Sequence, residues 1–264
     1  MKQKINFITY GDSKKYLISK KHILDMAKHS NFFEYCTGYG PEDLDKDFVN
    51  KYSNILNQKR GGGFYIWKME IIKKHLEELN DNDILVYCDS GSTLNYLAKQ
   101  RFFEYIDILN NSKNGNLRFE SKKNHIEKVW TTKELFQYFK IDLNSDIANS
   151  PQLLGGHLLF QKNEHTRYFI KQFFDVLNDD ENLITDYYKN GQIGEFIENR
   201  HDQSILSLIS KKHGGEILEN ETFFKKNSID QKQYPFLSVR HYGHGFRDRI
   251  LYNLGFYKKT PIYF

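Results

Sequence analysis

Residues 83–91 read Asp-Ile-Leu-Val-Tyr-Cys-Asp-Ser-Gly, and this stretch decides the fold. Residues 84–88 form an unbroken apolar run, which is typical of a short strand covered on both faces in an α/β sheet. Asp89, Ser90 and Gly91 follow at the carboxyl end of that strand. Because ligands bind outside the carboxyl ends of strands in open α/β sheets, we expect these three residues to line a binding site.

The segments around this strand alternate between strand and helix patterns. Residues 5–10 form a short, mostly apolar segment ended by a turn, and residues 153–160 resemble a strand interrupted by two glycines. Helical patterns cover 14–28, 69–79, 164–177 and 202–214, whereas 110–128 lack periodicity and predict a long, mobile loop. No repeat or proline-rich linker divides the chain. The sequence therefore predicts an α/β fold, with one domain over residues 1–264 and a mixed, mostly parallel central sheet flanked by helices.

The composition is that of a folded globular protein. The chain has 264 residues, of which 39% are hydrophobic and 16% aromatic, and these values exclude the low-hydrophobicity regime of disordered chains. The formal net charge of +4 is small and spread out, so we expect no nucleic-acid partner. The cysteines Cys36 and Cys88 cannot build a disulfide framework, and we expect both to be reduced.

The sequence predicts a cytoplasmic protein. The run at 84–88 is its longest apolar stretch, and a transmembrane helix needs roughly 20 such residues. The run at 5–8 is too short for the apolar core of a signal peptide. An aromatic and basic tail at 252–264 allows weak membrane contact at most, because two lysines there gain only about 2 kcal/mol at an anionic surface.

Asp89 has two interpretations at this stage. As a structural residue it would form an Asx turn at the end of the strand. As a functional residue its carboxylate would hold a divalent metal ion on a diphosphate, with Gly91 leaving room for close approach of the backbone.

Residues 60–68, Arg-Gly-Gly-Gly-Phe-Tyr-Ile-Trp-Lys, form a second candidate site. The segment combines backbone donors, flat aromatic faces and the cations Arg60 and Lys68 just before a predicted helix, whose dipole favours phosphate. This combination suits a nucleotide diphosphate, although the pattern matches neither a Walker loop nor a dinucleotide-binding turn. The alternative is a flexible turn with aromatic anchors in the core.

Residues 240–249 contain two histidines, His241 and His244, and three arginines that include Arg247. A structural zinc site does not fit, because no cysteine pair accompanies the histidines. An oxygen-rich magnesium or manganese site with one imidazole is one interpretation, and purely structural histidines are the other.

Four motifs occur in an order that resembles the GT-A glycosyltransferases. They are the segments 60–68 and 83–91, Leu154-Gly-Gly-His157, and the residues from His201 to Leu206. The resemblance is strongest to microbial and viral sugar transferases with Arg-Gly-x-Gly-Tyr-x-x-Trp-Lys and Tyr-x-Asp-x-Gly motifs. It extends over nearly the whole chain.

This resemblance implies a nucleotide-sugar donor, with a UDP-sugar favoured, and an acceptor hydroxyl on a glycan, a lipid-linked sugar or a protein. The residues it implies for donor binding are Thr9, Tyr10, Arg60, Trp67, Lys68, Asp89, Ser90, Gly91, Gly155, Gly156, His157 and Arg247. The ligands it implies for a manganese or magnesium ion are Asp89, His241 and His244. Gly91 replaces the second Asp of the family's Asp-x-Asp motif, so one expected metal ligand is missing.

Asp202 and Gln203 resemble the Asp-Gln pair that faces the transferred sugar in retaining members of the superfamily, so both are expected to be catalytic. A simple helix cap is the alternative for Asp202. Two other functions stay open: a non-catalytic nucleotide- or sugar-binding module on the same fold, and a nucleotidyltransferase, which would release pyrophosphate.

Overall fold

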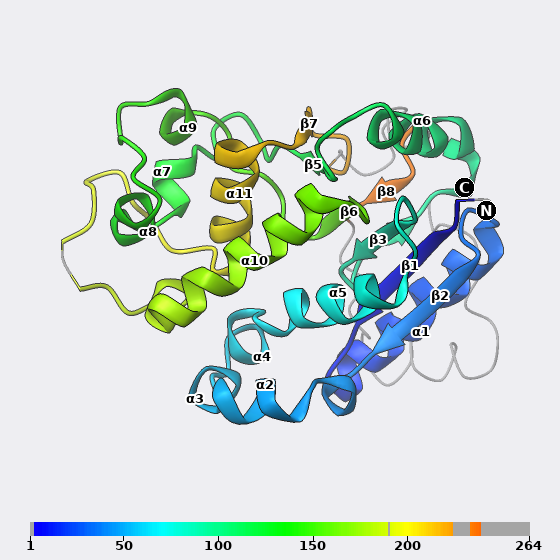
Figure 1. Cartoon of the computed structure of the whole chain (residues 1–264), viewed down its shortest axis with the longest axis horizontal. Coiled ribbons are helices and arrows are strands. Elements are labelled where there is room, and N and C mark those ends of the chain that lie inside the picture. The colour runs from blue at the N-terminus through cyan, green and yellow to red at the C-terminus, as the bar shows by residue number, and fades with distance from the viewer. Residues whose placement is uncertain (1–2, 190, 224–232, 239–264) are drawn as a thin grey trace.

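A six-stranded mixed sheet forms the centre of the computed structural model, which describes residues 3–189, 191–223 and 233–238 (Figure 1). The strand order is β2-β1-β3-β6-β5-β7. Neighbouring strands are parallel except at β6, which is antiparallel to both β3 and β5. The strands are β1 (Ile5–Tyr10), β2 (Tyr35–Tyr39), β3 (Ile84–Cys88), β5 (Asn116–Phe119), β6 (His157–Gln161) and β7 (Glu216–Leu218), and a separate pair joins β4 (Thr93–Leu94) to β8 (Phe236–Leu237).

Strand β3 is buried along its whole length, as its apolar sequence predicts. Ile84, Val86 and Cys88 pack into one hydrophobic cluster. Leu85 and Tyr87 pack into another on the opposite face, because successive side chains of a strand point to opposite sides. Both faces of the sheet therefore carry a hydrophobic core.

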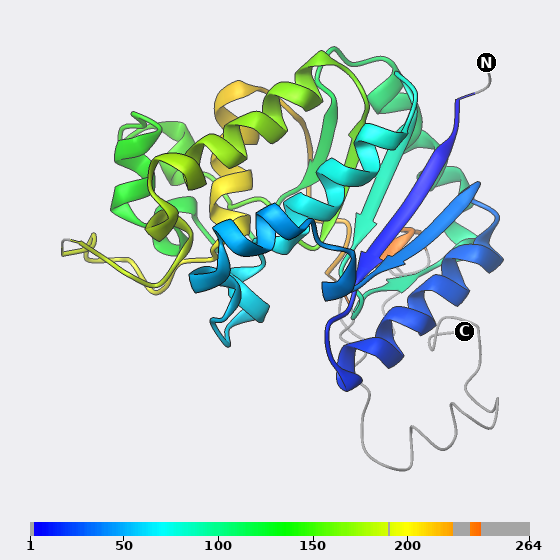
Figure 2. The ribbon, with the colours of Figure 1, turned by 60° about the horizontal axis from the view of Figure 1, so that its bottom comes forward.

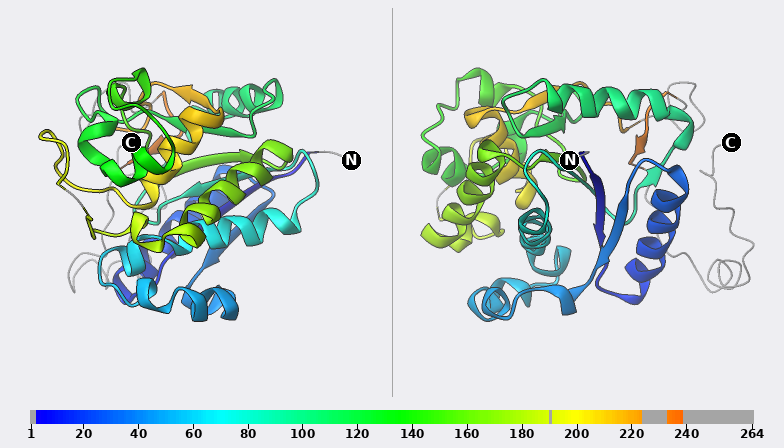
Figure 3. Two further views of the ribbon diagram at one scale, coloured as in Figure 1. Left: turned by 60° about the vertical axis from the view of Figure 1, so that its left-hand side comes forward. Right: turned by 45° about the vertical axis from the view of Figure 1, so that its right-hand side comes forward.

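Helices cover both faces of the sheet. The helices α5 (Trp67–Glu78), α10 (Glu164–Asp179) and α11 (Asp202–His213) pack on one face. The helices α1 (Lys14–Ser30) and α6 (Lys99–Asn110) pack on the other. In Figure 2 and in the right-hand view of Figure 3, the blue α1 and the cyan α5 lie on opposite sides of the blue strands. The result is a layered α/β architecture, as the sequence predicts.

Shorter helices lie in the connections. They are α2 (Lys46–Lys51), α3 (Ser53–Leu56), α4 (Gly61–Phe64), α7 (Glu127–Trp130), α8 (Lys133–Tyr138) and α9 (Asp146–Asn149), with 3₁₀ turns at Pro41–Asp43, Tyr96–Ala98 and Glu181–Ile184. None of the helices in the described ranges combines the length and the apolar character that crossing a bilayer requires.

The expected loop at 110–128 contains the strand β5, and this expectation was wrong. Asn116 and Arg118 interrupt the apolar pattern of the strand, yet both are fully buried. Asn116 donates to the carbonyl of Gly214, and Arg118 donates through its two terminal nitrogens to those of Leu154 and Leu206, while Arg118 Nε has no partner among the described residues. A core strand that contains buried polar residues with internal hydrogen-bond partners therefore shows no clear hydrophobicity pattern in the sequence.

The strand predicted at 153–160 begins only at His157, after the two glycines. At α11 the expected cap is also displaced by one residue, because His201 occupies the N-cap position and Asp202 is the first helical residue. The Asp202 carboxylate is instead part of the candidate site described below.

Candidate functional site

Asp89 lies directly after β3, where its backbone N–H donates to the carbonyl of Gly156 (2.9 Å). A backbone hydrogen bond closes the turn that follows, because the N–H of Ser92 donates to the Asp89 carbonyl, also at 2.9 Å. The carboxylate accepts a hydrogen bond from the Tyr87 hydroxyl at 2.7 Å, and half of the side chain is exposed. The Tyr87 hydroxyl thus bonds Oδ1, one of the two carboxylate oxygens of Asp89.

Lys68 joins Asp89 to the start of α11. Its Nζ donates to Asp202 Oδ2 at 2.6 Å and to the carbonyl of Gly155 at 2.9 Å, and lies 3.6 Å from Asp89 Oδ1. The rings of Tyr65 and Tyr87 each lie 5.4 Å from the ammonium, within the range of cation–π attraction. A buried cation thus bridges two carboxylates from different parts of the chain.

The charges of this cluster shift the pKa values of its members. Burial disfavours the Lys68 ammonium, but Asp202 and Asp89 outweigh that effect and raise its pKa. Burial also raises the pKa of Asp202 to about 6, with Lys68 offsetting only part of the effect. Lys68 therefore stays charged near neutral pH, while Asp202 titrates within the range where a carboxylate can exchange a proton.

The short segment α4 is a left-handed turn in its backbone angles, and it sets the position of Lys68. Residues 61–65 all have positive φ, between +54° and +93°, which glycine adopts freely but which strains Phe64 and Tyr65. Phe64 is buried against the ring of His201, with 4.6 Å between the ring centroids. The N-terminal end of α5 follows this turn at once, so the glycines at 61–63 position Lys68 rather than leave the segment flexible.

Tyr10 and Trp67, both expected to bind the donor, stack on one another. Their ring centroids are 3.8 Å apart with 16° between the planes, and the Trp67 indole donates to the carbonyl of Gly61. Only 5% of Tyr10 and 7% of Trp67 is exposed. The stack therefore offers little ring surface to a nucleotide base, and it supports the glycine turn. Thr9 is fully buried in β1.

Arg60 contacts carboxylates of the chain itself. Its guanidinium lies 2.9 Å from Glu198 Oε2 and 3.5 Å from Asp186 Oδ2. These ion pairs tie the glycine turn to the segment that precedes α11. The side chain is 39% exposed, so solvent screens the pairs and the cation stays accessible.

Gln203 and the two glycines before β6 complete the cluster. The Gly155 N–H donates to Gln203 Oε1 at 3.0 Å, and Gln203 Nε2 donates to Gln152 Oε1 at 2.6 Å. A Cβ atom on Gly156 would lie 2.9 Å from Asp89 Oδ2, closer than real side chains approach. Glycine is thus required for Asp89 to occupy its position.

His157 is fully buried beside this cluster and pairs with Cys88 across the sheet. Within the part of the chain that the structure describes, neither ring nitrogen has a hydrogen-bond partner. Burial lowers the pKa of the imidazole to about 4. His157 is therefore neutral at physiological pH and adds no charge beside the cluster.

A divalent metal ion needs more ligands than the described residues provide. Asp89 offers one carboxylate oxygen, and no group of three or more candidate ligands occurs among residues 3–189, 191–223 and 233–238. The described residues alone therefore do not form a metal site. The other expected ligands, His241 and His244, lie outside the described residues, as does Arg247.

Some members of the cluster escape prediction from sequence. The period of two in β3 places Tyr87 near Asp89, so the spacing could have identified it. Gln152 orients Gln203, and Arg118 holds the loop before Gly155 against α11, but no local pattern marks either residue. Ser90 is buried and Gly91 is half-buried beside Asp89, where the sequence predicts them.

The chain matches none of the known protein-family models and no curated protein. It is similar to solved structures of glycosyltransferases. The bifunctional glycosyltransferase WbbM matches with a TM-score of 0.50 and 11% identity, over 84% of this chain and 39% of WbbM. A glycosyltransferase involved in glycosylation of the major capsid of PBCV-1 has a TM-score of 0.49 and 11% identity, over 94% of this chain and 98% of its own. At these identities the likeness to WbbM shows the fold alone, which this chain shares with that glycosyltransferase.

Proposed function

We propose that the protein is a retaining glycosyltransferase that moves a hexose from a nucleotide sugar, with UDP favoured, to a hydroxyl of a glycan, a lipid-linked sugar or a protein. The observation that carries this proposal is the convergence of Lys68, Asp89 and Asp202 at the carboxyl end of β3. Ligand sites of α/β sheets lie at this edge. The adjacent residues Gly155 and Gly156 add no side chains of their own to the cluster.

The chemistry of sugar transfer requires two kinds of polar group. The departing diphosphate gains negative charge, which fixed cations stabilise most strongly in a site shielded from water. Hydroxyl groups of the sugar need acceptors that do not move. Lys68 supplies a buried cation, and its hydrogen bond fixes Asp202 as an acceptor.

The surroundings of Asp202 support a retaining mechanism. In an inverting enzyme a carboxylate must reach the acceptor hydroxyl, at about 2.6–3.2 Å, and take its proton. Asp202 is 2% exposed and already bonded to Lys68, which leaves it poorly placed to approach a second substrate. Gln203 lies beside it, with its amide held by Gly155 and Gln152, and is the group that we assign beneath the anomeric carbon.

A divalent metal ion remains part of the proposal. Asp89 would provide one ligand, and the ion would neutralise part of the diphosphate charge. Because the described residues do not complete a metal site, every step above depends on side chains of the protein alone.

Thermal-shift and hydrolysis measurements test the proposed function together. UDP, GDP, CMP and their sugars are screened for stabilisation with and without Mn²⁺, and donors that stabilise the protein are then followed for hydrolysis. We expect a shift with UDP-sugars and slow release of free sugar and UDP. Stabilisation without any hydrolysis would instead favour a binding module, and release of pyrophosphate would favour a nucleotidyltransferase.

A further inference from the structure

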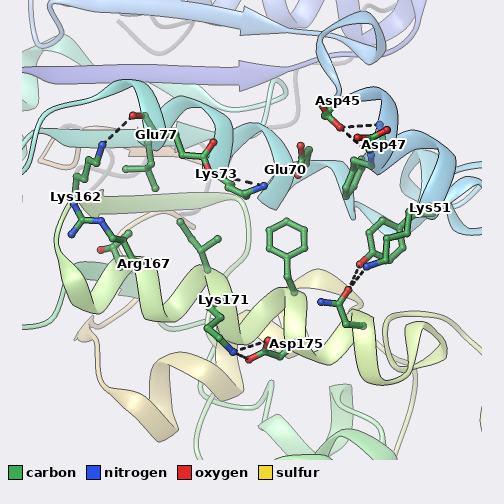
Figure 4. A pocket seen from close by; sticks show the side chains of 17 residues that line it. Asp45, Asp47, Lys51, Glu70, Lys73, Glu77, Lys162, Arg167, Lys171 and Asp175 are labelled. Atoms are coloured by element: carbon green, nitrogen blue, oxygen red, sulfur yellow. Dashed lines mark hydrogen bonds and ion pairs between the residues drawn. The ribbon is translucent and has the colours of Figure 1, made fainter.

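A groove of about 720 Å³ lies between α2, α5 and α10, apart from the cluster of Lys68, Asp89, Asp202 and Gln203, none of which lines it. Figure 4 shows Glu70, Lys73 and Glu77 on the α5 wall and Lys171 and Asp175 on the α10 wall. Its volume is in the range of pockets that hold small molecules. Nothing in the proposed transfer reaction uses this groove.

The floor of the groove is apolar and partly aromatic. Phe48 from α2, Leu76 from α5, and Ile170 and Phe174 from α10 line it. Aromatic rings at a ligand-accessible floor offer flat surfaces against which the C–H faces of a ligand can pack.

Glu70 is the unusual residue of this groove. It lines the groove although only 5% of it is exposed, and among the described residues its carboxylate has no hydrogen-bond or ion-pair partner. Neighbouring charges on the rim are paired, since Lys73 lies 4.0 Å from Glu77 and Lys171 lies 2.7 Å from Asp175. Burial raises the pKa of Glu70, with Lys73 lowering it in part. Because the carboxylate lines the groove without a protein partner, its oxygens can accept hydrogen bonds from the donors of a ligand.

A hydrogen-bond donor faces the same groove from α10. Asn178 Oδ1 accepts from Lys51 Nζ at 2.5 Å and from the Tyr52 hydroxyl at 2.8 Å. Because the Lys51 ammonium can only donate, its partner must be the amide oxygen, and this bond fixes the orientation of the amide. The NH₂ group of Asn178 is therefore available to a ligand.

We propose that this groove binds a neutral carbohydrate, whose hydroxyls donate to Glu70 and accept from Asn178 while its C–H face covers the apolar floor. Five basic and five acidic residues line the groove, so their formal charges cancel and favour an uncharged ligand. A sugar combines donors, acceptors and an apolar face in one ring. An organic cation would satisfy Glu70 but would meet the cations Lys51, Lys73 and Lys171. The site is independent of the proposed transferase activity.

NMR titration of the whole protein with maltose, lactose and chitobiose tests this site. We expect at least one of the sugars to shift resonances of α2, α5 and α10 around the groove. Glu70→Gln should weaken that binding about tenfold or more, because it removes a hydrogen-bond acceptor that carries charge. The matched control Glu77→Gln changes a carboxylate on the same helix that already pairs with Lys73, and it should leave the dissociation constant within about twofold.

A second variant and a nucleotide probe complete the experiment. Phe174→Ala removes part of the floor and leaves Glu70 intact, and it should also weaken binding of the sugar. UDP serves as the probe of the other site, so sugar binding without UDP binding would support the groove and contradict the proposed transferase. No groove shift with any of the three sugars, equal affinity in Glu70→Gln, or choline binding in place of the sugars would overturn the proposal.

Discussion

The ammonium group of Lys68 lies 2.6 Å from a carboxylate oxygen of Asp202, and only 4% of each side chain is exposed. The two residues belong to the first turns of α5 and α11, and they are 134 positions apart in sequence. The left-handed turn at 61–65 positions one partner, while the loop around Gly155 and the Gln152–Gln203 hydrogen bond position the other. A single buried ion pair thus joins three motifs of the sequence into one site.

Replacing Lys68 should damage both activity and stability. Lys68→Met keeps most of the apolar stem but leaves Asp202 buried without its cation. We expect donor turnover to fall by about 10²–10³, the usual effect of losing one fixed electrostatic group. We also expect the free energy of unfolding to fall by about 3–5 kcal/mol, because an uncompensated carboxylate stays in the core.

Lys73→Met is the matched control for Lys68→Met. Lys73 lies on the same helix, but its side chain is 43% exposed, so both turnover and urea denaturation should resemble those of the wild type. Full turnover by Lys68→Met would show that the buried pair has no part in the reaction.

The ionisation of Asp202 should appear in the pH profile of the reaction. Burial raises its pKa to about 6, and transfer requires the ionised form, so kcat/KM should rise as pH increases through about 6. Asp202→Asn should reduce turnover severely and remove this inflection. Gln203→Ala should reduce turnover moderately and keep the inflection, since the Asp202 carboxylate is intact. An unchanged inflection in Asp202→Asn would assign it to another group.

Some residues of this site can be predicted from the sequence, because their positions depend on local structure. Asp89 directly follows an apolar run that is typical of a buried strand, and the glycines at 61–63 stand where the backbone adopts positive φ. By contrast, the contact between Lys68 and Asp202 depends on how α5 and α11 pack on the sheet, and local periodicity carries no information on such long-range pairing. Strand β5 was missed for a related reason, because Arg118 finds its partners in distant segments.

The glycine turn should tolerate side chains poorly. A Cβ atom on Gly63 would lie 2.6 Å from the Leu56 Cα, and φ is +93° at this position. We expect Gly63→Ala to lower the free energy of unfolding by about 2 kcal/mol or more, from strain and the backbone clash together. In the control Gly194→Ala the new methyl group meets no atom of the described residues within 4 Å, so urea denaturation should be nearly unchanged. Equal stability of the two variants would mean that the turn differs from the one described.

His157 should make the protein sensitive to acid. Burial lowers its folded-state pKa from 6.5 to about 4, so the unfolded chain binds more protons between these values. The contribution of neutral His157 to stability is therefore complete above pH 6.5 and is lost as the pH falls to 4, a change of up to about 3 kcal/mol. In His157→Leu the free energy of unfolding should decrease less over this interval than in the wild type.

The matched control for His157→Leu is His29→Gln, which removes an exposed imidazole from α1. Denaturation curves at pH 6.5, 5 and 4 compare the three proteins. Equal acid sensitivity of His157→Leu and the wild type would show that His157 is protonated or exposed in the folded protein.

Proton NMR of UDP-hexose turnover, with Mn²⁺ present, tests the central claim most directly. The wild type should consume an α-linked donor and release UDP together with a sugar, or an acceptor product, whose first detected anomer is α. Asp202→Asn should consume almost none of the same donor. A β product would contradict retention and require Asp202 to be reconsidered as the base, whereas consumption at equal rates by the wild type and Asp202→Asn would contradict the site itself.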